Sequence, residues 1–240
     1  MARIDDAALV REEYAEPDRL ATRFKPFREY HDRDLHGEIA GIIAALAPTR
    51  VLEVGAGEGE FTELLRSRVT CDVLAMDQSP MMTGRAASRG LDAVVGDVQN
   101  LPFPDATFDV VVANWMLYHL PDLPRGLQEL HRVLVPGGHL VATTMGSSML
   151  QEIWDLLPED GSTPKLTFSA ENAAEHLATV FASVRRVDLS GVATFPDRDA
   201  VVEYVESTLT RAHLSADLPE FEGPLQSRTT NAVFIAEKAD

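Results

Sequence analysis

The amino-acid sequence predicts an α/β protein with a doubly wound parallel sheet. Short apolar runs of strand length alternate with helical stretches between about residues 50 and 145, and a turn with three glycines follows the first run. Strands that alternate with helices are joined by right-handed crossovers, which place successive strands parallel in one sheet. The 240 residues are enough for one sizeable core, so we expect a single domain.

The elements of the first half follow from periodicity and from helix breakers. Residues 33–47 predict an amphipathic helix that ends at Pro48, because apolar side chains recur on one face. Residues 100–105 predict a surface loop, since their two prolines lack backbone donors, and Pro136-Gly137-Gly138 predicts a tight turn into the fifth strand. The expected strands are 51–54, 72–76, 91–95, 108–113 and 138–145.

The second half predicts one more helix, two strands and an insertion. We expect a helix over 170–182, capped by Ser169, and strands over 184–190 and 231–237. The insertion, residues 191–230, contains an amphipathic helix. Val201, Val205 and Leu209 lie on one face of it. Two interpretations remain open for this insertion, a lid over the strand ends where ligands bind or a peripheral packing or dimer helix.

Composition disfavours several classes of function. The net charge of −17 repels phosphate backbones and argues against a nucleic-acid substrate. No apolar run reaches roughly 18 residues, and acids near the N-terminus interrupt the apolar core that a signal peptide needs. We therefore expect a cytoplasmic protein. The single cysteine, Cys71, cannot form an intrachain disulfide, and no Cys/His cluster has metal-ligand spacing.

The turn after the first strand is the main candidate for a ligand site. Residues 51–59 read Val-Leu-Glu-Val-Gly-Ala-Gly-Glu-Gly, and a helix signal follows at once. Glycines allow positive φ and close backbone approach, and a helix start offers unpaired N–H donors. This geometry suits a nucleotide or a carboxylate, although a tight turn without a ligand has the same pattern.

Two acids strengthen the ligand interpretation. Asp77 ends the second apolar run, about as far after the turn as the ribose-binding acid of dinucleotide folds, and Asp97 ends the third. In a parallel sheet these strand ends stand side by side, so one ligand can touch the turn and both acids. Each acid taken singly is also compatible with a helix N-cap.

The glycine spacing separates two classes of cofactor. A nicotinamide fingerprint is G-x-G-x-x-G, whereas here the third glycine comes early, as Gly55-x-Gly57-x-Gly59, and Glu53 lies within the strand end. This pattern resembles the class I S-adenosylmethionine-dependent methyltransferases, of the type 11, small-molecule branch, whose first motif is E/D-x-G-x-G-x-G. The resemblance continues through Asp77, Gly96-Asp97-Val98, residues 108–114 and residues 134–138, in order along roughly residues 40 to 145.

The resemblance implies a Rossmann-like, seven-stranded, mostly parallel sheet with an antiparallel last strand and a helical lid insertion. It implies S-adenosylmethionine as cofactor and, as cofactor-binding residues, Glu53, Gly55, Ala56, Gly57, Gly59, Asp77, Gln78, Met82, Gly96, Asp97, Val98, Asn114, Trp115, Met116, His119 and Tyr14. The turn would hold the methionine part of the cofactor and Asp77 the ribose hydroxyls, with Gln78 and Ser79 on that side. Asp97 would accept from the adenine amino group, and the N–H of Val98 would meet a ring nitrogen.

Several of these residues have a second interpretation. Glu53 either supports the methionine part of the cofactor or bonds loop N–H groups, and Met82 either packs on adenine or fills the core. Trp115 either stacks beside the sulfonium, for about 0.5–2 kcal/mol of cation–π energy, or fills the core. His119 is the candidate catalytic residue, as a general base with a side chain that titrates near neutral pH, and a purely structural histidine is the alternative.

Methyl transfer is a direct displacement, so the resemblance implies no catalytic triad. A hydroxyl acceptor would need a base, with His119 first and Tyr118 or Glu203 after it, whereas an amine needs only a proton sink. We expect the acceptor pocket to form from residues 10–30, the segment after the fourth strand, and the 191–230 lid. Its mixed side chains weakly favour an amine or aromatic acceptor. They are Phe195, Glu203, Tyr204, Glu206 and Phe221.

The expected organisation is one methyltransferase domain, residues 1–240. It consists of a cap segment (1–32), a core (33–190 and 231–240) and the lid (191–230). The acceptor is expected to be a small molecule methylated at O or N, and the chain a monomer or homodimer. Three rivals remain: a nicotinamide-dependent oxidoreductase, a non-catalytic S-adenosylmethionine-binding protein, and a nucleic-acid methyltransferase, which the charge opposes.

Overall fold

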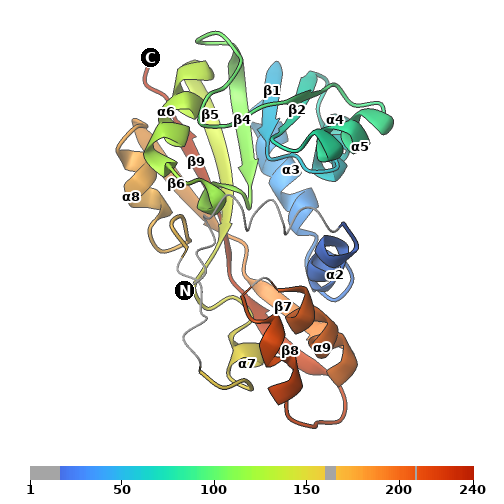
Figure 1. Cartoon of the computed structure of the whole chain (residues 1–240). Coiled ribbons are helices and arrows are strands. Elements are labelled where there is room, and N and C mark those ends of the chain that lie inside the picture. The colour runs from blue at the N-terminus through green and yellow to red at the C-terminus, as the bar shows by residue number, and fades with distance from the viewer. Residues whose placement is uncertain (1–16, 160–165, 209) are drawn as a thin grey trace.

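The computed structural model describes residues 17–159, 166–208 and 210–240 (Figure 1). Tyr14, one of the expected cofactor-binding residues, and Leu209, on the expected lid helix, lie outside the described residues. No helix in these ranges is long and apolar enough to span a membrane.

The core is a seven-stranded sheet in the order β3-β2-β1-β4-β5-β9-β6. Neighbouring strands from β3 to β5 pair in parallel, and β9 is antiparallel to both β5 and β6. This confirms the fold class, including the antiparallel last strand. The strands are β1 (Arg50–Val54), β2 (Asp72–Asp77), β3 (Ala93–Val95), β4 (Phe108–Asn114), β5 (Leu134–Met145), β6 (Ser183–Asp188) and β9 (Asn231–Glu237).

Helices cover both faces of the sheet, because the central strands are apolar on both sides. α3 (Leu35–Ala45) and α4 (Glu60–Arg68) pack on one face through a cluster that includes Ile39, Leu65 and Val112. α6 (Leu123–Val133) and α8 (Ala173–Ala178) cover the other face. α5 (Pro80–Ser88) packs on β2 and β3, and α2 (Pro17–Arg28), α7 (Gln151–Trp154) and the 3-10 turn η1 (Leu117–His119) lie outside these layers.

Two local expectations were wrong. Pro136-Gly137-Gly138 is not a turn before the fifth strand, because β5 already pairs with β4 at Leu134 and resumes at His139 after a register shift. The proline and glycines therefore form a bulge within the strand. The helix expected over 170–182 is limited to α8, with Asn172 at the N-cap position, and the Ser169 hydroxyl accepts from Glu171 N instead of capping it.

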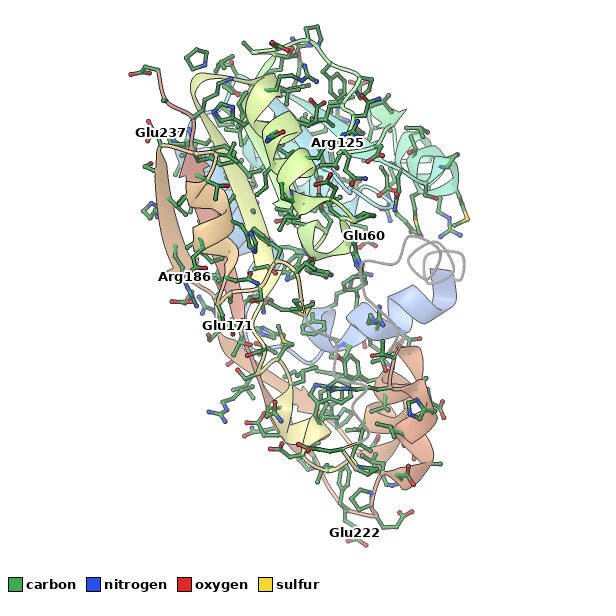
Figure 2. The ribbon with its side chains drawn as sticks, turned by 60° about the vertical axis from the view of Figure 1, so that its left-hand side comes forward. Glu60, Arg125, Glu171, Arg186, Glu222 and Glu237 are labelled. Carbon is green, nitrogen blue, oxygen red and sulfur yellow. The ribbon has the colours of Figure 1, made fainter. Side chains whose placement is uncertain are left out.

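The segment 191–230 forms a separate small unit below the sheet in Figure 1. It contains β7 (Gly191–Phe195), α9 (Arg198–Ser207), η2 (Ala212–Asp217) and β8 (Leu225–Thr229). Val201 and Val205 are buried on one face of α9, as expected. β7 and β8 form a two-stranded antiparallel sheet that the sequence analysis did not predict. Figure 2 shows Glu222 at the tip of this unit and Glu237 at the opposite end of the molecule.

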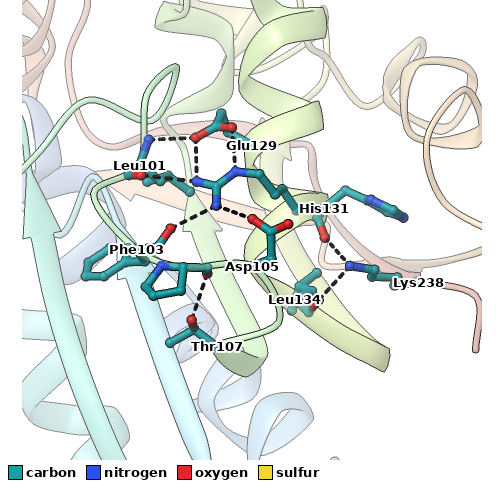
Figure 3. A network of polar contacts seen from close by, with 10 residues as sticks. Leu101, Phe103, Asp105, Thr107, Glu129, His131, Leu134 and Lys238 are labelled. Carbon is teal, nitrogen blue, oxygen red and sulfur yellow. Dashed lines mark hydrogen bonds and ion pairs between the residues drawn. The ribbon is translucent and has the colours of Figure 1, made fainter.

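The loop of residues 100–105 is irregular, as predicted, and is held by Arg132 on α6. The guanidinium of Arg132 donates to two carboxylates and to two backbone carbonyls of the loop. Its partners are Glu129, Asp105, Leu101 O and Phe103 O, at 2.7–3.1 Å. Figure 3 shows these residues arranged around the guanidinium. The contacts fix the loop that follows Asp97.

Candidate cofactor and acceptor site

The glycine turn lies at the carboxyl end of β1, between β2 and β4. The sheet order reverses there, which is the usual ligand position in an open α/β sheet. Gly55, Gly57 and Gly59 all have positive φ, of 67°, 55° and 80°. A Cβ at Gly55 would approach Met116 within 2.9 Å, whereas a Cβ at Gly57 would meet nothing within 4 Å. The turn is thus packed on the Met116 side and open at Gly57. Ala56 anchors it to β2 through its N–H, which donates to Met76 O at 3.0 Å.

Asp77 stands beside this turn at the end of β2. Its Oδ2 accepts from Gly57 N at 2.9 Å and its Oδ1 accepts from Ser79 N at 2.8 Å. Burial raises the pKa of Asp77, and the two backbone donors oppose that rise. A carboxylate has about four acceptor positions, so two remain for a pair of hydroxyls.

Glu53 is buried beneath the turn. The hydroxyl of Thr62 on α4 donates to its Oε2 at 2.5 Å. The pKa of Glu53 is raised to about 8, chiefly by burial; the Thr62 hydrogen bond opposes this rise, and the nearby charge of Asp77 adds to it. The interpretation in which Glu53 bonds loop N–H groups is not what the structure shows, since its hydrogen-bond partner is the Thr62 side chain.

The third strand end contributes Gly96, Asp97 and Val98. Gly96 N donates to Asp77 O at 3.0 Å, so the second and third strand ends are directly joined. A Cβ at Gly96 would lie 2.5 Å from the Met76 sulfur, which explains the glycine by packing. The exposed Asp97 accepts from Gln99 N at 2.8 Å, and Val98 is buried. The turn and the two predicted acids therefore meet at one edge of the sheet.

The two predicted residues on the ribose and adenine side differ in exposure. Gln78 is exposed next to Asp77. Met82 is fully buried on α5, so the structure places it in the core and not on an open adenine surface. The neighbouring Met81 is 41% exposed instead. The one-residue difference reflects helix phase, because residues i and i+1 of a helix face different directions.

The segment after β4 turns sharply at Trp115, which has φ of 49°. Asn114 accepts from the Thr143 hydroxyl at 2.7 Å, and the Trp115 ring lies 5.5 Å from the ring of His36. The rings of Tyr118 and His119 are 4.5 Å apart. Trp115 and His119 both line a cavity, whereas Met116 packs against Gly55.

This cavity, of about 1620 Å³, lies between the carboxyl edge of the sheet, α2, the loop after β5 and the small unit of residues 191–230. Figure 2 shows Glu171, which contributes to its lining, at the waist between the two parts of the molecule. The lining of the cavity includes six aromatic side chains: Phe24, Phe27, Trp115, Tyr118, Trp154 and Tyr204. The space exceeds the roughly 300–1,000 Å³ of typical ligand pockets.

Of the acceptor-pocket residues expected in 191–230, only Tyr204 lines the cavity. Phe195 is buried in the core of the small unit, and Phe221 packs against that core. Glu203 and Glu206 are exposed on α9, and Glu203 pairs with Lys25 at 3.5 Å. Glu203 is therefore removed as a candidate base.

Several residues that line the cavity carry no signal in the sequence, among them His36 and Asn231. Arg23 and Arg211 also line it, within the ranges 10–30 and 191–230 that were expected to form the acceptor pocket. Asn231 is buried, and its Oδ1 accepts from the Trp115 indole Nε1 at 3.0 Å. Burial lowers the pKa of His36, and the charge of Arg28 lowers it further. No local motif marks these residues, because they come from four separate segments of the chain.

The sequence of the chain is similar to known methyltransferases. A family model described as a methyltransferase domain matches residues 52–142, the segment that carries the turn and both acids. A malonyl-[acyl-carrier protein] O-methyltransferase of Halorhodospira halophila is 33% identical over 170 residues, covering 68% of this chain and 51% of that protein. The matched segment belongs to the methyltransferase-domain family. The chain spans about half the length of the curated relatives it matches, with 51%, 49% and 49% of the first three covered.

Solved methyltransferases share the fold. A possible histamine N-methyltransferase from Thermotoga maritima has a TM-score of 0.61 at 18% identity, covering 94% of this chain and 97% of that one. The Haemonchus contortus phosphoethanolamine N-methyltransferase 2, solved with phosphomonomethylethanolamine and S-adenosylhomocysteine, has a TM-score of 0.57 at 18% identity. The match covers 85% of this chain and 52% of the Haemonchus contortus protein. At this identity the likeness to these methyltransferases concerns the fold alone.

Proposed function

We propose that the protein is an S-adenosylmethionine-dependent methyltransferase that transfers a methyl group to an oxygen or nitrogen of a small molecule. The observation that carries this proposal is the arrangement of Asp77 beside Gly57. The carboxylate is held by two backbone N–H groups and retains acceptor positions toward the open side of the turn. The family match supports the same cofactor, and the methyltransferase of Haemonchus contortus that shares the fold was solved with S-adenosylhomocysteine.

The residues at the strand ends fit this cofactor. Asp77 would bind the ribose hydroxyls, the N–H groups of the open turn the methionine carboxylate, and Asp97 with Val98 the adenine. Because Glu53 is buried, it would support the cofactor site from beneath the turn, through Thr62 and the turn itself. S-adenosylmethionine supplies, when bound, an electrophilic methyl carbon on a good leaving group.

The chain's own contribution would be alignment of the acceptor and removal of its proton. Alignment of reacting atoms can lower a barrier by up to about 7–11 kcal/mol. Trp115 and His119, at the cavity wall nearest β4, would flank the reacting atom. We assign His119 as the proton acceptor for a hydroxyl substrate, since imidazole exchanges protons near neutral pH. The unit of residues 191–230 would act as a lid on the acceptor side.

The same residues support the two rival functions less well. A nicotinamide enzyme needs the longer glycine spacing that this turn lacks. A protein that binds S-adenosylmethionine without catalysis would keep Asp77 and the turn, but would have no need of the large cavity that reaches His119.

Incubation with methyl-labelled S-adenosylmethionine and a panel of phenols, carboxylates and amines tests the proposal. We expect label in at least one small product. With a hydroxyl acceptor, His119→Asn should reduce turnover by about 10²–10⁴-fold while S-adenosylhomocysteine still binds. His213→Asn, at an exposed position outside the cavity, is the matched control. Cofactor binding without any labelled product across the panel would favour the non-catalytic rival.

A further inference from the structure

His36 lies at the end of the cavity where the sheet edge and the glycine turn meet. It is on the first turn of α3, and its imidazole lines the cavity. The centre of the ring is 5.5 Å from that of Trp115, which follows β4, and 5.6 Å from that of Phe61 on α4. His36 therefore packs against both segments that border the carboxyl end of β1: the helix that follows the glycine turn and the turn that follows β4.

The imidazole of His36 is only partly buried, and it forms no hydrogen bond with the residues that the structure describes. Phe61 meets the ring edge-on, at an interplanar angle of 69°, so this neighbour packs against it and offers no polar group. The indole N–H of Trp115 is donated to Asn231, which leaves only the aromatic surface of Trp115 for His36. The neighbours of His36 thus hold its ring in place without using its nitrogens.

The ring of His36 is uncharged at neutral pH. Burial lowers its pKa, and the charge of Arg28 on α2 lowers it further, whereas the charges of Glu60 on α4 and Asp34 before α3 oppose this shift. Arg28 and Glu60 form an ion pair with each other, and burial is the largest cause of the shift. The two aromatic neighbours of the ring carry no charge. This part of the cavity wall therefore consists of neutral aromatic rings.

A neutral aromatic wall suits a cation, whereas a charged imidazolium in the same place would repel one. The face of an aromatic ring attracts a cation, and among side chains Trp does so most strongly. Repulsion between two positive charges is strong in a partly buried site, where little water screens it. S-adenosylmethionine carries a sulfonium cation, and S-adenosylhomocysteine carries a neutral thioether at the same position. The ratio of their affinities therefore reports the charge of the wall that faces this group.

We propose that His36 contacts the sulfonium end of bound S-adenosylmethionine and forms, with Trp115, an uncharged aromatic wall for it. The inference rests on the proposed function, in which Trp115 flanks the reacting atom, and it adds a residue of α3 that no cofactor motif includes. The role differs from that of His119, which takes the proton of the acceptor. Since methyl transfer leaves the sulfur uncharged, the same wall favours the substrate over its product and assists release of S-adenosylhomocysteine.

Ligands that differ by one charge test this inference on the intact protein. Calorimetry at neutral pH measures the affinities of S-adenosylmethionine, of its unreactive cationic analogue sinefungin and of neutral S-adenosylhomocysteine. His36→Lys places a charge on the wall and should lower the ratio of cation affinity to S-adenosylhomocysteine affinity roughly tenfold or more. His36→Phe keeps an uncharged ring and should leave the ratio within about threefold of the wild type. A ratio taken within one protein does not depend on how much of a variant is folded.

Gln151→Lys is the matched control. Gln151 lines the cavity from α7, which lies next to β8 in the lower part of Figure 1, and this variant should leave the ratio unchanged. In the wild type, the NMR signals of the His36 ring should shift by different amounts with sinefungin and with S-adenosylhomocysteine.

Three results would overturn the inference: an unchanged ratio in His36→Lys, an equal fall in Gln151→Lys, or identical responses of the His36 signals to both ligands. The last comparison uses the wild type and does not depend on the folding of any variant. Failure of the wild type to bind S-adenosylhomocysteine would count against the proposed function instead.

Discussion

The indole Nε1 of Trp115 donates a hydrogen bond to Oδ1 of Asn231 at 3.0 Å. This bond joins the end of β4 to the first residue of β9, on the same edge of the sheet. Trp115 has a left-handed backbone conformation, and Asn231 is only 3% exposed. Nδ2 of Asn231 is buried and has no hydrogen-bond partner among the described residues. The pair holds the ring of Trp115 against the cavity.

Removal of the indole N–H should therefore destabilise the protein. Trp115→Phe leaves the Asn231 oxygen buried without its donor, at a cost of about 1–3 kcal/mol in the free energy of unfolding. Asn231→Leu should cost a comparable amount, and the double variant less than the sum, because neither partner is then stranded. Urea denaturation of the four proteins measures this coupling. Strictly additive losses would show that the bond does not join the two residues energetically.

The glycines of the turn should respond differently to alanine. Positive φ costs an L-residue about 1–2 kcal/mol at either position, but only a Cβ at Gly55 also meets Met116 within 2.9 Å. We expect Gly55→Ala to lose about 1–3 kcal/mol more stability than Gly57→Ala. Gly57→Ala should remain folded and bind S-adenosylhomocysteine at least tenfold more weakly, since its Cβ enters the open side of the turn. Denaturation and calorimetry separate the two effects; equal stability loss, or full ligand affinity in Gly57→Ala, would contradict this account of the turn.

Stability should fall as pH rises through the range in which Glu53 titrates. The pKa of Glu53 is raised from 4.5 to about 8, chiefly by burial, so the folded protein keeps a proton that the unfolded chain has released between these values. Folding then binds a proton, and the free energy of unfolding decreases with pH by at most about 1.4 kcal/mol per unit from this group.

Glu53→Gln should remove that component. Denaturation at several pH values should show the variant gaining stability relative to the wild type as pH rises toward 8. Glu63→Gln, at an exposed position on α4, controls for the loss of a carboxylate. A difference between Glu53→Gln and the wild type that does not vary with pH would contradict the assignment of a buried, protonated Glu53.

The sequence was sufficient for features that depend on local pattern. The strand positions and Asp77 follow from apolar runs and from the residue that ends each run, which are properties of neighbouring residues. Pro136-Gly137-Gly138 shows the limit of local pattern. These residues have turn chemistry, but pairing of β4 with Leu134 before them makes them a bulge.

Features that depend on distant segments were not predictable in this way. β7 and β8 are five-residue strands without strong alternation, and each becomes a strand only through pairing with the other. His36 and Asn231 line one cavity from α3 and β9. Their spacing along the chain carries no motif, so only the tertiary fold shows that they belong to one site. Met81 and Met82 are neighbours on α5, and the periodicity of the sequence does not show which of them is exposed.

Calorimetric titration with S-adenosylmethionine, S-adenosylhomocysteine and NAD(H) tests the central claim most directly. Asp77→Asn removes the charge beside Gly57, and Asp72→Asn makes the same change at the exposed other end of β2. We predict micromolar binding of both adenosyl ligands, at least tenfold weaker in Asp77→Asn, unchanged in Asp72→Asn, and no binding of NAD(H). Binding of NAD(H) alone, or adenosyl binding that Asp77→Asn leaves intact, would contradict the assignment of this strand edge as an S-adenosylmethionine site.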